Sequence, residues 1–147
     1  MMKKTTLFKL MKYWPPYLGA GVSVDFISPE LDQIDVSMKM RFWNKNYVKT
    51  HFGGSLYSMT DPFYMLMLME RLGRDYIVWD KAATINFKKP GKGKVYAKFH
   101  LSEEQVNQIK FDVAEKKKVF PVFEVEVKDE RGDVVCTVTK TLYVKLK

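Results

Sequence analysis

The stretch GGSLYSMTDPFYMLMLMERL, residues 53–72, decides the fold of this chain. Large apolar side chains fall on every side of a helix drawn through it: Leu56, Tyr57, Met59, Phe63, Tyr64, Met65, Leu66, Met67, Leu68, Met69 and Leu72. A helix that is apolar all round is buried on all sides. The uninterrupted apolar run, 63–69, is far below the roughly 20 residues that cross a membrane. The pattern therefore predicts a helix at the centre of a protein core.

The dipeptide Asp61-Pro62 interrupts this stretch and allows two interpretations. Asp is a good N-cap and Pro is favoured at the first helical position, so a helix could begin here. If the helix instead begins at Gly53, Pro62 removes the hydrogen bond to the Ser58 carbonyl and favours a kink. Both interpretations place a carboxylate among apolar groups, where it has little structural purpose unless it is partnered or functional.

Runs of alternating apolar and polar residues on both sides of this helix predict β-strands. The runs are 22–28, 34–42, 76–79, 84–87, 95–101, 122–127 and 134–146. Between the runs 95–101 and 122–127, Ser102 and Gln105 have the capping-box spacing that begins a helix. Turns at 90–93 and 129–132 separate strands into hairpins. This order of elements predicts an α+β fold in which an antiparallel sheet wraps around a long central helix.

The N-terminal residues 5–13 predict a short amphipathic helix, which Pro15-Pro16 ends. Its apolar stripe has helical spacing and consists of Leu7, Leu10, Met11 and Trp14. Packing on the domain is the expected fate of so short a helix, and membrane contact is not expected. Lys9 and Lys12 interrupt the apolar segment that a secretion signal would need.

The composition predicts a single domain spanning residues 1–147. Of the 147 residues, 46% are apolar, which is enough for one sizeable core, whereas two domains would each be too small. The single cysteine, Cys136, lies in an alternating run and has neither a disulfide partner nor companions for a zinc site. We interpret it as a buried strand residue. A cytoplasmic setting is therefore expected, and no metal.

The net charge of +8 comes from 25 basic and 17 acidic residues and favours anionic partners. Lysines cluster at 3–4, 88–94 and 116–118, whereas the four arginines are scattered. Since arginine does most base recognition, nucleic-acid binding is not expected. Solvated lysine faces are the simpler interpretation of the clusters.

The segment NYVKTHFGGSLYSMTD, residues 46–61, carries the main candidate site. It places Asn46, the Gly53-Gly54 pair and Asp61 at the mouth of the apolar helix. Together with Pro90 in a later turn and the order of strands, this segment resembles the hotdog-fold acyl-CoA thioesterases, in particular the phenylacetyl-CoA type and a thioesterase-like branch. The resemblance covers most of the chain. It implies a hotdog fold and hydrolysis of an acyl-CoA or acyl-carrier thioester by a homodimer or homotetramer.

The resemblance also implies roles for these residues. Asp61 of one subunit would act as base or nucleophile, and Gly53 and Gly54 of another would polarise the carbonyl. Asn46 would orient water or the thioester. Coenzyme A would be part of the substrate, with no further cofactor. Chemistry supports the glycine role independently, because backbone N–H groups at a helix N-terminus stabilise an oxyanion and glycine permits a close approach.

Further residues are candidate substrate contacts. The family's histidine before Gly-Gly is Phe52 here, and His51 lies one position earlier, so its side chain points elsewhere. By its offset from the later proline, a polar residue of the following strand falls near Asp80 and Lys81. The lysines at 88–94 would suit the phosphates of coenzyme A. The substrate-binding candidates are His51, Phe52, Tyr57, Asp80, Lys81, Lys88 and Lys89.

Each assignment has a structural alternative. Asn46 could stabilise a turn through its side chain, and Asp80 and Lys81 could form a local or cross-strand ion pair. Tyr57 could be a core residue whose hydroxyl finds a partner. For the whole protein, the alternatives are a non-catalytic acyl-CoA or lipid binder that uses the same apolar groove, and a hydratase or dehydratase, whose histidine-containing motif this chain does not show.

Overall fold

The structure is a computed structural model that describes residues 4–147. In this range an antiparallel seven-stranded sheet has the order β1-β2-β4-β6-β7-β3, and β5 pairs with β7 off this path. The strands are β1 (Val22–Ile27), β2 (Gln33–Lys39), β3 (Tyr76–Phe87), β4 (Lys94–His100), β5 (Lys118–Val119), β6 (Val122–Asp129) and β7 (Val134–Leu146). The helices are α1 (Lys4–Leu10), η1 (Met11–Tyr13), α2 (Pro15–Ala20), α3 (Gly53–Ser58), α4 (Phe63–Leu72) and α5 (Glu103–Lys116). The predicted antiparallel sheet with a helical stretch over 53–72 is confirmed.

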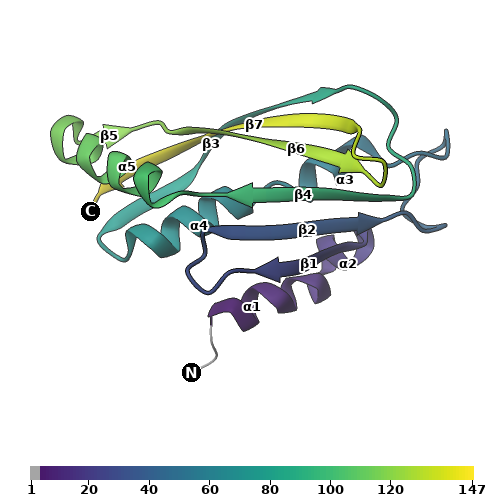
Figure 1. Ribbon diagram of the computed structural model, residues 1–147, viewed down its shortest axis with the longest axis horizontal. Coiled ribbons are helices and arrows are strands. Elements are labelled where there is room, and N and C mark those ends of the chain that lie inside the picture. The colour runs from purple at the N-terminus through teal and green to yellow at the C-terminus, as the bar shows by residue number, and fades with distance from the viewer. Residues whose placement is uncertain (1–3) are drawn as a thin grey trace.

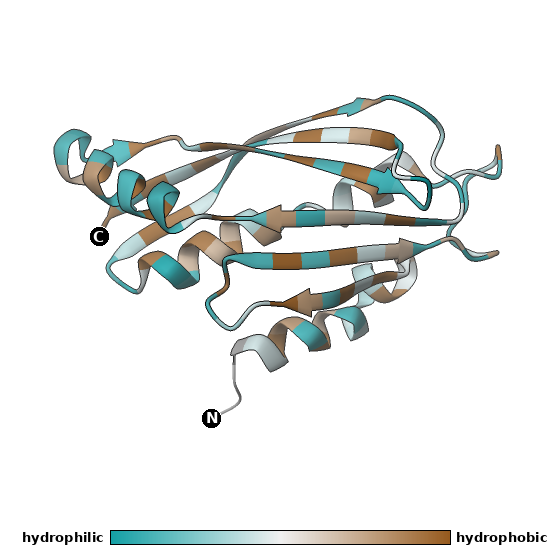
Figure 2. Ribbon diagram, viewed as in Figure 1, coloured by the Kyte–Doolittle hydropathy of each residue, from teal (hydrophilic) through white to brown (hydrophobic). Residues whose placement is uncertain are grey.

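The core lies between the sheet and the apolar helix α4. Along β6 buried and exposed positions alternate, and along β7 buried and half-buried positions alternate, because successive side chains point to opposite faces of the sheet. Figure 2 shows the same alternation of brown and teal along β2 and β4. Phe63, Met67 and Leu68 of α4 belong to one apolar cluster with the inward residues of the strands. In Figure 1, α3 and α4 run along one face of the sheet, α1 and α2 lie beside β1, and α5 lies at the far end near β5.

The central helix is two helices rather than one. Residues 59–62 form turns between α3 and α4, so the kink at Pro62 is realised as a break. Asp61 does not cap α4, because the N-cap is Pro62 and no side chain caps it. Nor is α4 buried all round, since Met69 is exposed. The alternative interpretation is thus correct that a helix begins at this dipeptide and wrong that Asp61 caps it, which leaves the Asp61 carboxylate available for other partners.

The edge strand β3 joins two runs that the sequence predicted as separate strands, 76–79 and 84–87. A β-bulge at Lys81 shifts the register between Asp80 and Ala82. The bulge interrupts the alternation in the sequence, but the long partner β7 pairs with β3 on both sides of it. On its other side, β3 pairs with no strand among residues 4–147.

The N-terminal segment differs most from expectation. Pro15-Pro16 ends one helix but also begins another, because Pro is favoured in the first turn of α2. Of the predicted inward stripe, Leu7, Leu10 and Trp14 are exposed. Phe8 of α1 and Tyr17 of α2 are buried instead. The segment therefore packs on the domain as predicted, through Phe8, Tyr17 and the half-buried Met11. The predicted stripe is wrong for its other three members, which face outward.

Other predictions of local structure are confirmed. Ser102 caps α5 and forms a complete capping box with Gln105. Cys136 is a free, buried strand residue, and burial raises the pKa of its thiol to about 11. No helix among residues 4–147 is long and apolar enough to cross a membrane.

Candidate functional site

Asp61 lies just beyond the end of α3, where its carboxylate meets two donors. The Tyr57 hydroxyl, one helical turn earlier, donates to Asp61 Oδ1 at 2.7 Å. Lys140 Nζ of β7 donates to the same oxygen at 2.5 Å. The Asp61 side chain remains 47% exposed. Among the described residues, both donors take Oδ1, which leaves Oδ2 to face solvent or a substrate.

Lys140 is the centre of this cluster. Its side chain is only 2% exposed and also meets Asp80 Oδ1 at 3.2 Å and the Tyr57 hydroxyl at 3.0 Å. A buried ammonium is costly unless it is paired, and two carboxylates and a hydroxyl supply the partners here. Burial alone would lower the pKa of Lys140, but the bonds to Asp61 and Tyr57 and the nearby Asp80 raise it above its usual value. Lys140 is therefore a buried cation.

The neighbours of this cation respond to burial as well. Burial is the main cause that raises the pKa of Asp80, and Asp61 raises it further, while Lys140 opposes both. Burial likewise raises the pKa of Tyr57, so its hydroxyl stays protonated and can donate to Asp61. The four residues form one polar cluster, which we call the Lys140 cluster: Tyr57, Asp61, Asp80 and Lys140. It can hold an ionised Asp61 carboxylate in a fixed orientation.

The sequence contained a signal for Lys140 that the pattern analysis missed. Every second residue of β7 from Cys136 to Val144 is buried, and Lys140 occupies one of these inward positions. A lysine on the core face of an alternating strand needs a buried acidic partner. The candidate partners, Asp61 and Asp80, were already identified on other grounds. Asp80 forms the cross-strand ion pair that its structural alternative allowed, but with Lys140 of β7 and not with Lys81. Lys81 instead lies over the Phe120 ring at 4.1 Å.

The other end of α3 is organised differently. The backbone N–H groups of Ser55 and Leu56 donate to the Phe52 carbonyl and form the first hydrogen bonds of α3. The N–H groups of Gly53 and Gly54 come before these bonds, so they have no acceptor within the helix. A Cβ atom at Gly54 would lie 2.6 Å from the Phe52 ring, and one at Gly53 would lie 3.0 Å from the Phe87 ring. Both glycines therefore make room for aromatic rings, whatever else they do.

Asn46 and His51 brace the loop before α3. The Asn46 side chain accepts from Thr50 N and donates to Thr50 Oγ1, both at 2.9 Å, which is the turn role that its alternative interpretation predicted. His51 is buried, and its Nε2 lies 2.7 Å from the Gly93 carbonyl. Its Nδ1 has no hydrogen-bond partner among the described residues. Both side chains are thus occupied in holding loops together.

The two ends of α3 do not meet within one chain. The six residues of α3 span about 9 Å at about 1.5 Å per residue, and Asp61 lies beyond the end opposite Gly53. The structure brings Asp61, Tyr57 and Asp80 together, and it keeps Asn46 with the glycines at the opposite end.

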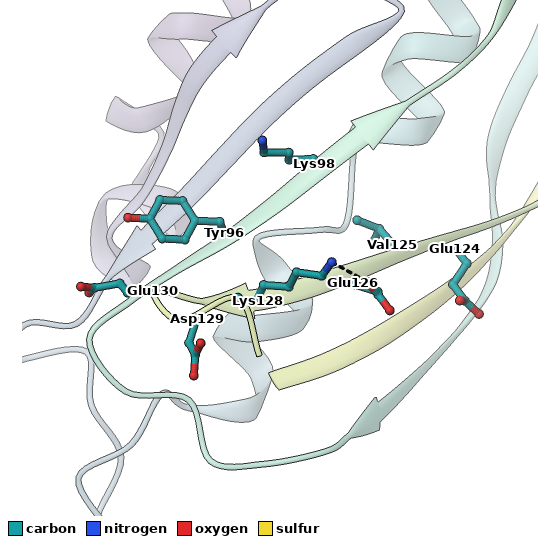
Figure 3. A pocket seen from close by; sticks show the side chains of 9 residues that line it. Tyr96, Lys98, Glu124, Val125, Glu126, Lys128, Asp129 and Glu130 are labelled. Carbon is teal, nitrogen blue, oxygen red and sulfur yellow. Dashed lines mark ion pairs between the residues drawn. The ribbon is translucent and has the colours of Figure 1, made fainter. Parts of the chain in front are cut away.

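A cleft of about 560 Å³ opens beside the glycine end, between α2, residues 43–46 and α3. Its lining includes Pro15, Pro16, Trp43, Asn46, Phe52, Gly54 and Ser58. A second hollow, of about 830 Å³, lies on the solvent side of β4 and β6 (Figure 3). That hollow is lined by side chains such as Lys98, Glu124 and the ion-paired Glu126 and Lys128, and none of the predicted site residues lines it. The cleft is the better place for an apolar ligand.

The basic candidates near the 88–94 turn are unequal. Lys89 is held by Asp129 at 2.6 Å and Asp133 at 2.8 Å, and these bonds raise its pKa. Lys88 is exposed. No group of three His, Cys, Asp or Glu side chains within residues 4–147 could hold a metal ion.

The family model for DUF4442, a domain of unknown function, matches residues 3–144. This chain belongs to the DUF4442 family. No curated protein matches the sequence.

Solved structures share the fold of this DUF4442 protein at low identity. A protein of unknown function and probable thioesterase from Pseudomonas aeruginosa has a TM-score of 0.87 at 18% identity and covers 100% of this chain and 99% of its own. A thioesterase from Haemophilus influenzae has a TM-score of 0.70 at 16% identity, covering 99% and 92%. A protein of unknown function from Chlorobaculum tepidum has a TM-score of 0.77 at 14% identity, covering 97% and 94%. The resemblance to hotdog-fold thioesterases is confirmed at the level of the fold.

Proposed function

We propose that this protein hydrolyses an acyl thioester, with Asp61 as the group that activates water. The observation that carries the proposal is the Lys140 cluster, in which two donors fix Asp61 Oδ1 and leave Oδ2 for a water molecule. Packing alone does not explain why the buried Lys140 lies beside the half-exposed Asp61. Apolar residues would fill the same space at a lower cost in free energy.

In the proposed reaction, Asp61 takes a proton from water as the water oxygen attacks the thioester carbon. The carbonyl oxygen becomes an oxyanion, for which the backbone N–H groups of Gly53 and Gly54 are donors. When the carbon–sulfur bond breaks, the thiolate leaves and receives the proton that Asp61 holds. The products are a carboxylic acid and a free thiol. Direct attack by Asp61 on the carbonyl, followed by hydrolysis of the anhydride, would use the same residues.

We further propose that a second copy of the chain completes the site. Asp61 and the glycines lie at opposite ends of α3, so one chain does not supply both to one substrate. The long strand β3 supports this step, because it presents an unpaired edge and proteins usually cover such edges. A homodimer, or a dimer of dimers, would place the carboxylate of one copy near the glycines of the other.

The proposed substrate is an acyl-CoA or acyl-carrier thioester. The cleft beside Phe52 and Trp43 offers apolar surface for an acyl chain, and the exposed Lys88 offers a point charge for a phosphate. Lys89 contributes less in this scheme, since Asp129 and Asp133 already engage it.

The test is release of free thiol from a panel of acyl-CoAs by the purified protein. Asp61→Asn keeps an oxygen for Tyr57 and Lys140 but removes the base, and it should lower turnover at least about 100-fold. Asp25→Asn, an exposed site on β1, should turn over like the wild type. Circular dichroism and melting temperature establish that both variants are folded. Unchanged turnover in Asp61→Asn would refute the mechanism.

A non-catalytic acyl-CoA or lipid binder is the second candidate, and one observation favours it. The Phe52 ring lies against Gly54, at the position where the resembling enzymes have histidine. Acyl-CoA binding in the cleft without any thiol release, measured by calorimetry on the same preparation, would select this function.

A further inference from the structure

The N-terminal helices and the loop after β2 expose a group of large apolar side chains, of which only Trp43 also lines the cleft proposed for the acyl chain. The group is Leu7 and Leu10 of α1, Tyr13 of η1, Trp14, Leu18 of α2, and Phe42 and Trp43 of the loop. Phe42 is 81% exposed. We call this group the N-terminal surface. Single exposed apolar residues are ordinary, but a gathering of this size marks an interaction site.

Contacts join the part of this surface around Trp43. Tyr13, Leu18 and Trp43 line one hollow with Lys12 and Arg41. Phe42 packs edge-on against Trp43, with ring centroids 5.0 Å apart. Leu7 and Leu10 are one helical turn apart, so they share a side of α1, whereas Phe8 is buried. Figure 1 shows α1 and α2 along the same border of the molecule, outside the sheet.

The net positive charge of the sequence falls in two segments that contain all the residues of this surface. Residues 1–24 and 36–60 contain eight of the 25 basic residues and none of the 17 acidic ones, so the rest of the chain carries 17 of each. The net charge of +8 therefore resides in these segments alone. Lys9, Lys12, Arg41, Lys45 and Lys49 of this set are exposed.

Two basic side chains lie directly on the aromatic rings of the surface. Lys12 Nζ is 4.9 Å from the Tyr13 ring centroid, and Arg41 is 5.2 Å from that of Trp43. Leucine, tryptophan and tyrosine bordered by lysine and arginine are the side chains of helices that lie in a membrane interface. Tryptophan and tyrosine sit at the headgroup level, while basic side chains reach the phosphates.

A second copy of the chain fits this surface poorly. A two-fold contact would bring the same acid-free, basic segments of both copies against each other. The like charges of these segments would then face each other. An anionic bilayer supplies both the apolar layer for the leucines and rings and the negative charge for the lysines.

We propose that the N-terminal surface docks on the face of an anionic lipid bilayer, with α1 and α2 lying in the interface and the 41–49 loop beside them. The proposal is independent of the reaction proposed above. The surface borders the cleft at Trp43, so docking would bring the cleft next to the bilayer.

The experiment is co-sedimentation of the full chain with vesicles. Vesicles of phosphatidylcholine with about one third phosphatidylglycerol should bind the protein at about 0.1 M salt, and binding should fall at least about tenfold at about 1 M salt. Pure phosphatidylcholine vesicles should bind at least about tenfold more weakly. No binding to the anionic vesicles at low salt would overturn the proposal.

Matched variants locate the binding. Lys9→Glu with Lys12→Glu should weaken binding more than about tenfold, since each lysine near the surface contributes about fivefold. Lys116→Glu with Lys118→Glu makes the same charge change at the end of α5 and should have a smaller effect. Leu7→Ser with Leu10→Ser should weaken binding, whereas Phe111→Ser, an equally exposed apolar site on α5, should not. Equal losses in both members of either pair would refute docking through this surface.

Two further measurements distinguish the occupant. Tryptophan emission should shift to shorter wavelength when anionic vesicles are added, and Trp79→Phe should keep the shift, because Trp14 and Trp43 lie on the surface while Trp79 lies on β3. Sedimentation velocity should give the same mass for the wild type and for Leu7→Ser with Leu10→Ser. A smaller mass for the variant would show that a second copy, rather than a bilayer, covers the surface.

Discussion

The two ends of α3 were joined by a single sequence pattern, but they are built in different ways. At the end near Asp61, a buried lysine, a tyrosine and a second aspartate surround the carboxylate, and polar contacts dominate. At the glycine end, the Phe52 and Phe87 rings lie against the backbone, and the nearby polar side chains of Asn46 and His51 brace loops.

This difference separates two kinds of residue. The glycines have a steric reason to be at their positions, whereas Asp61 and Lys140 need a chemical one. Gly53 and Gly54 already have a steric role, because a Cβ atom at either position would crowd an aromatic ring, so their presence alone is weak support for catalysis. Asp61 and Lys140 have no comparable packing reason, because an ion pair in a core is seldom more stable than apolar residues of the same volume. The predictions below test each end in turn.

Removing the cation of the polar end should have the largest effect. Lys140→Met leaves Asp61 and Asp80 facing each other without a positive charge, and we expect a loss of about 2–3 kcal/mol in the free energy of unfolding. Thiol release should fall at least about 100-fold, because Asp61 loses the donor that orients it. Urea denaturation and kcat measure the two effects. Lys140→Arg keeps the charge and should recover part of both.

A double-mutant cycle gives this prediction its control. The double variant Asp61→Asn with Lys140→Met should lose less free energy of unfolding than the two single variants lose together. The difference, which is the coupling energy, should exceed about 1 kcal/mol. Strictly additive losses would mean that the 2.5 Å contact between Lys140 and Asp61 contributes nothing to stability.

The hydroxyl of Tyr57 should come next in size. Tyr57→Phe removes the bond to Asp61 and the acceptor for Lys140, which should cost about 1 kcal/mol of stability. Thiol release should fall about tenfold or less, since Lys140 still holds Asp61. Tyr47→Phe, at a fully exposed hydroxyl, is the matched control and should leave both measurements unchanged. A Tyr57→Phe protein indistinguishable from that control would remove Tyr57 from the cluster.

How much of the two ends of α3 could be predicted from the sequence depends on how far apart the interacting residues lie along the chain. Local signals succeeded: the Ser102 capping box, the alternation of β6 and β7, and the buried Cys136 all depend on neighbours a few residues away. Lys140 lies 79 positions from Asp61, and only the pairing of β7 within the sheet brings them together. The family pattern predicts an acidic residue in the helix, but it does not predict which residue of a distant strand pairs with that acid.

The wrong predictions have the same origin. The strand runs 76–79 and 84–87 seemed separate because a bulge at Lys81 breaks the alternation that a single strand would show. The stripe on α1 was expected to pack inward because a periodic pattern defines a face but not its direction. Phe8 and Tyr17 point inward instead, and only the position of β1 decides this.

A substitution at the glycine end can separate the packing role of Gly54 from the close approach of a substrate carbonyl to its backbone. A methyl group at Gly54 would meet the outer edge of the Phe52 ring, which is exposed and free to swing away, so Gly54→Ala should cost less than about 1 kcal/mol. If the backbone of Gly54 receives the carbonyl oxygen, thiol release should nevertheless fall about tenfold. Phe52→Ala with Gly54→Ala restores the space and should restore stability without restoring the rate. Recovery of the rate in this double variant would show that the glycine serves the ring alone.

The smallest expected effect concerns His51, which precedes the glycines. Burial lowers the pKa of His51 and outweighs the opposing bond to the Gly93 carbonyl, so the folded protein disfavours the charged ring. The unfolded chain takes up the proton first as the pH falls below about 6.5. The neutral ring therefore contributes to the free energy of unfolding above that pH, and this contribution is lost as the pH falls through the folded pKa.

Urea denaturation between about pH 7.5 and pH 5 should show this loss in the wild type and in a variant of the exposed second histidine, His100→Gln. His51→Gln, whose amide can still donate to Gly93, should flatten the profile. An equal slope in all three proteins would show that the buried ring at the glycine end does not govern the acid response.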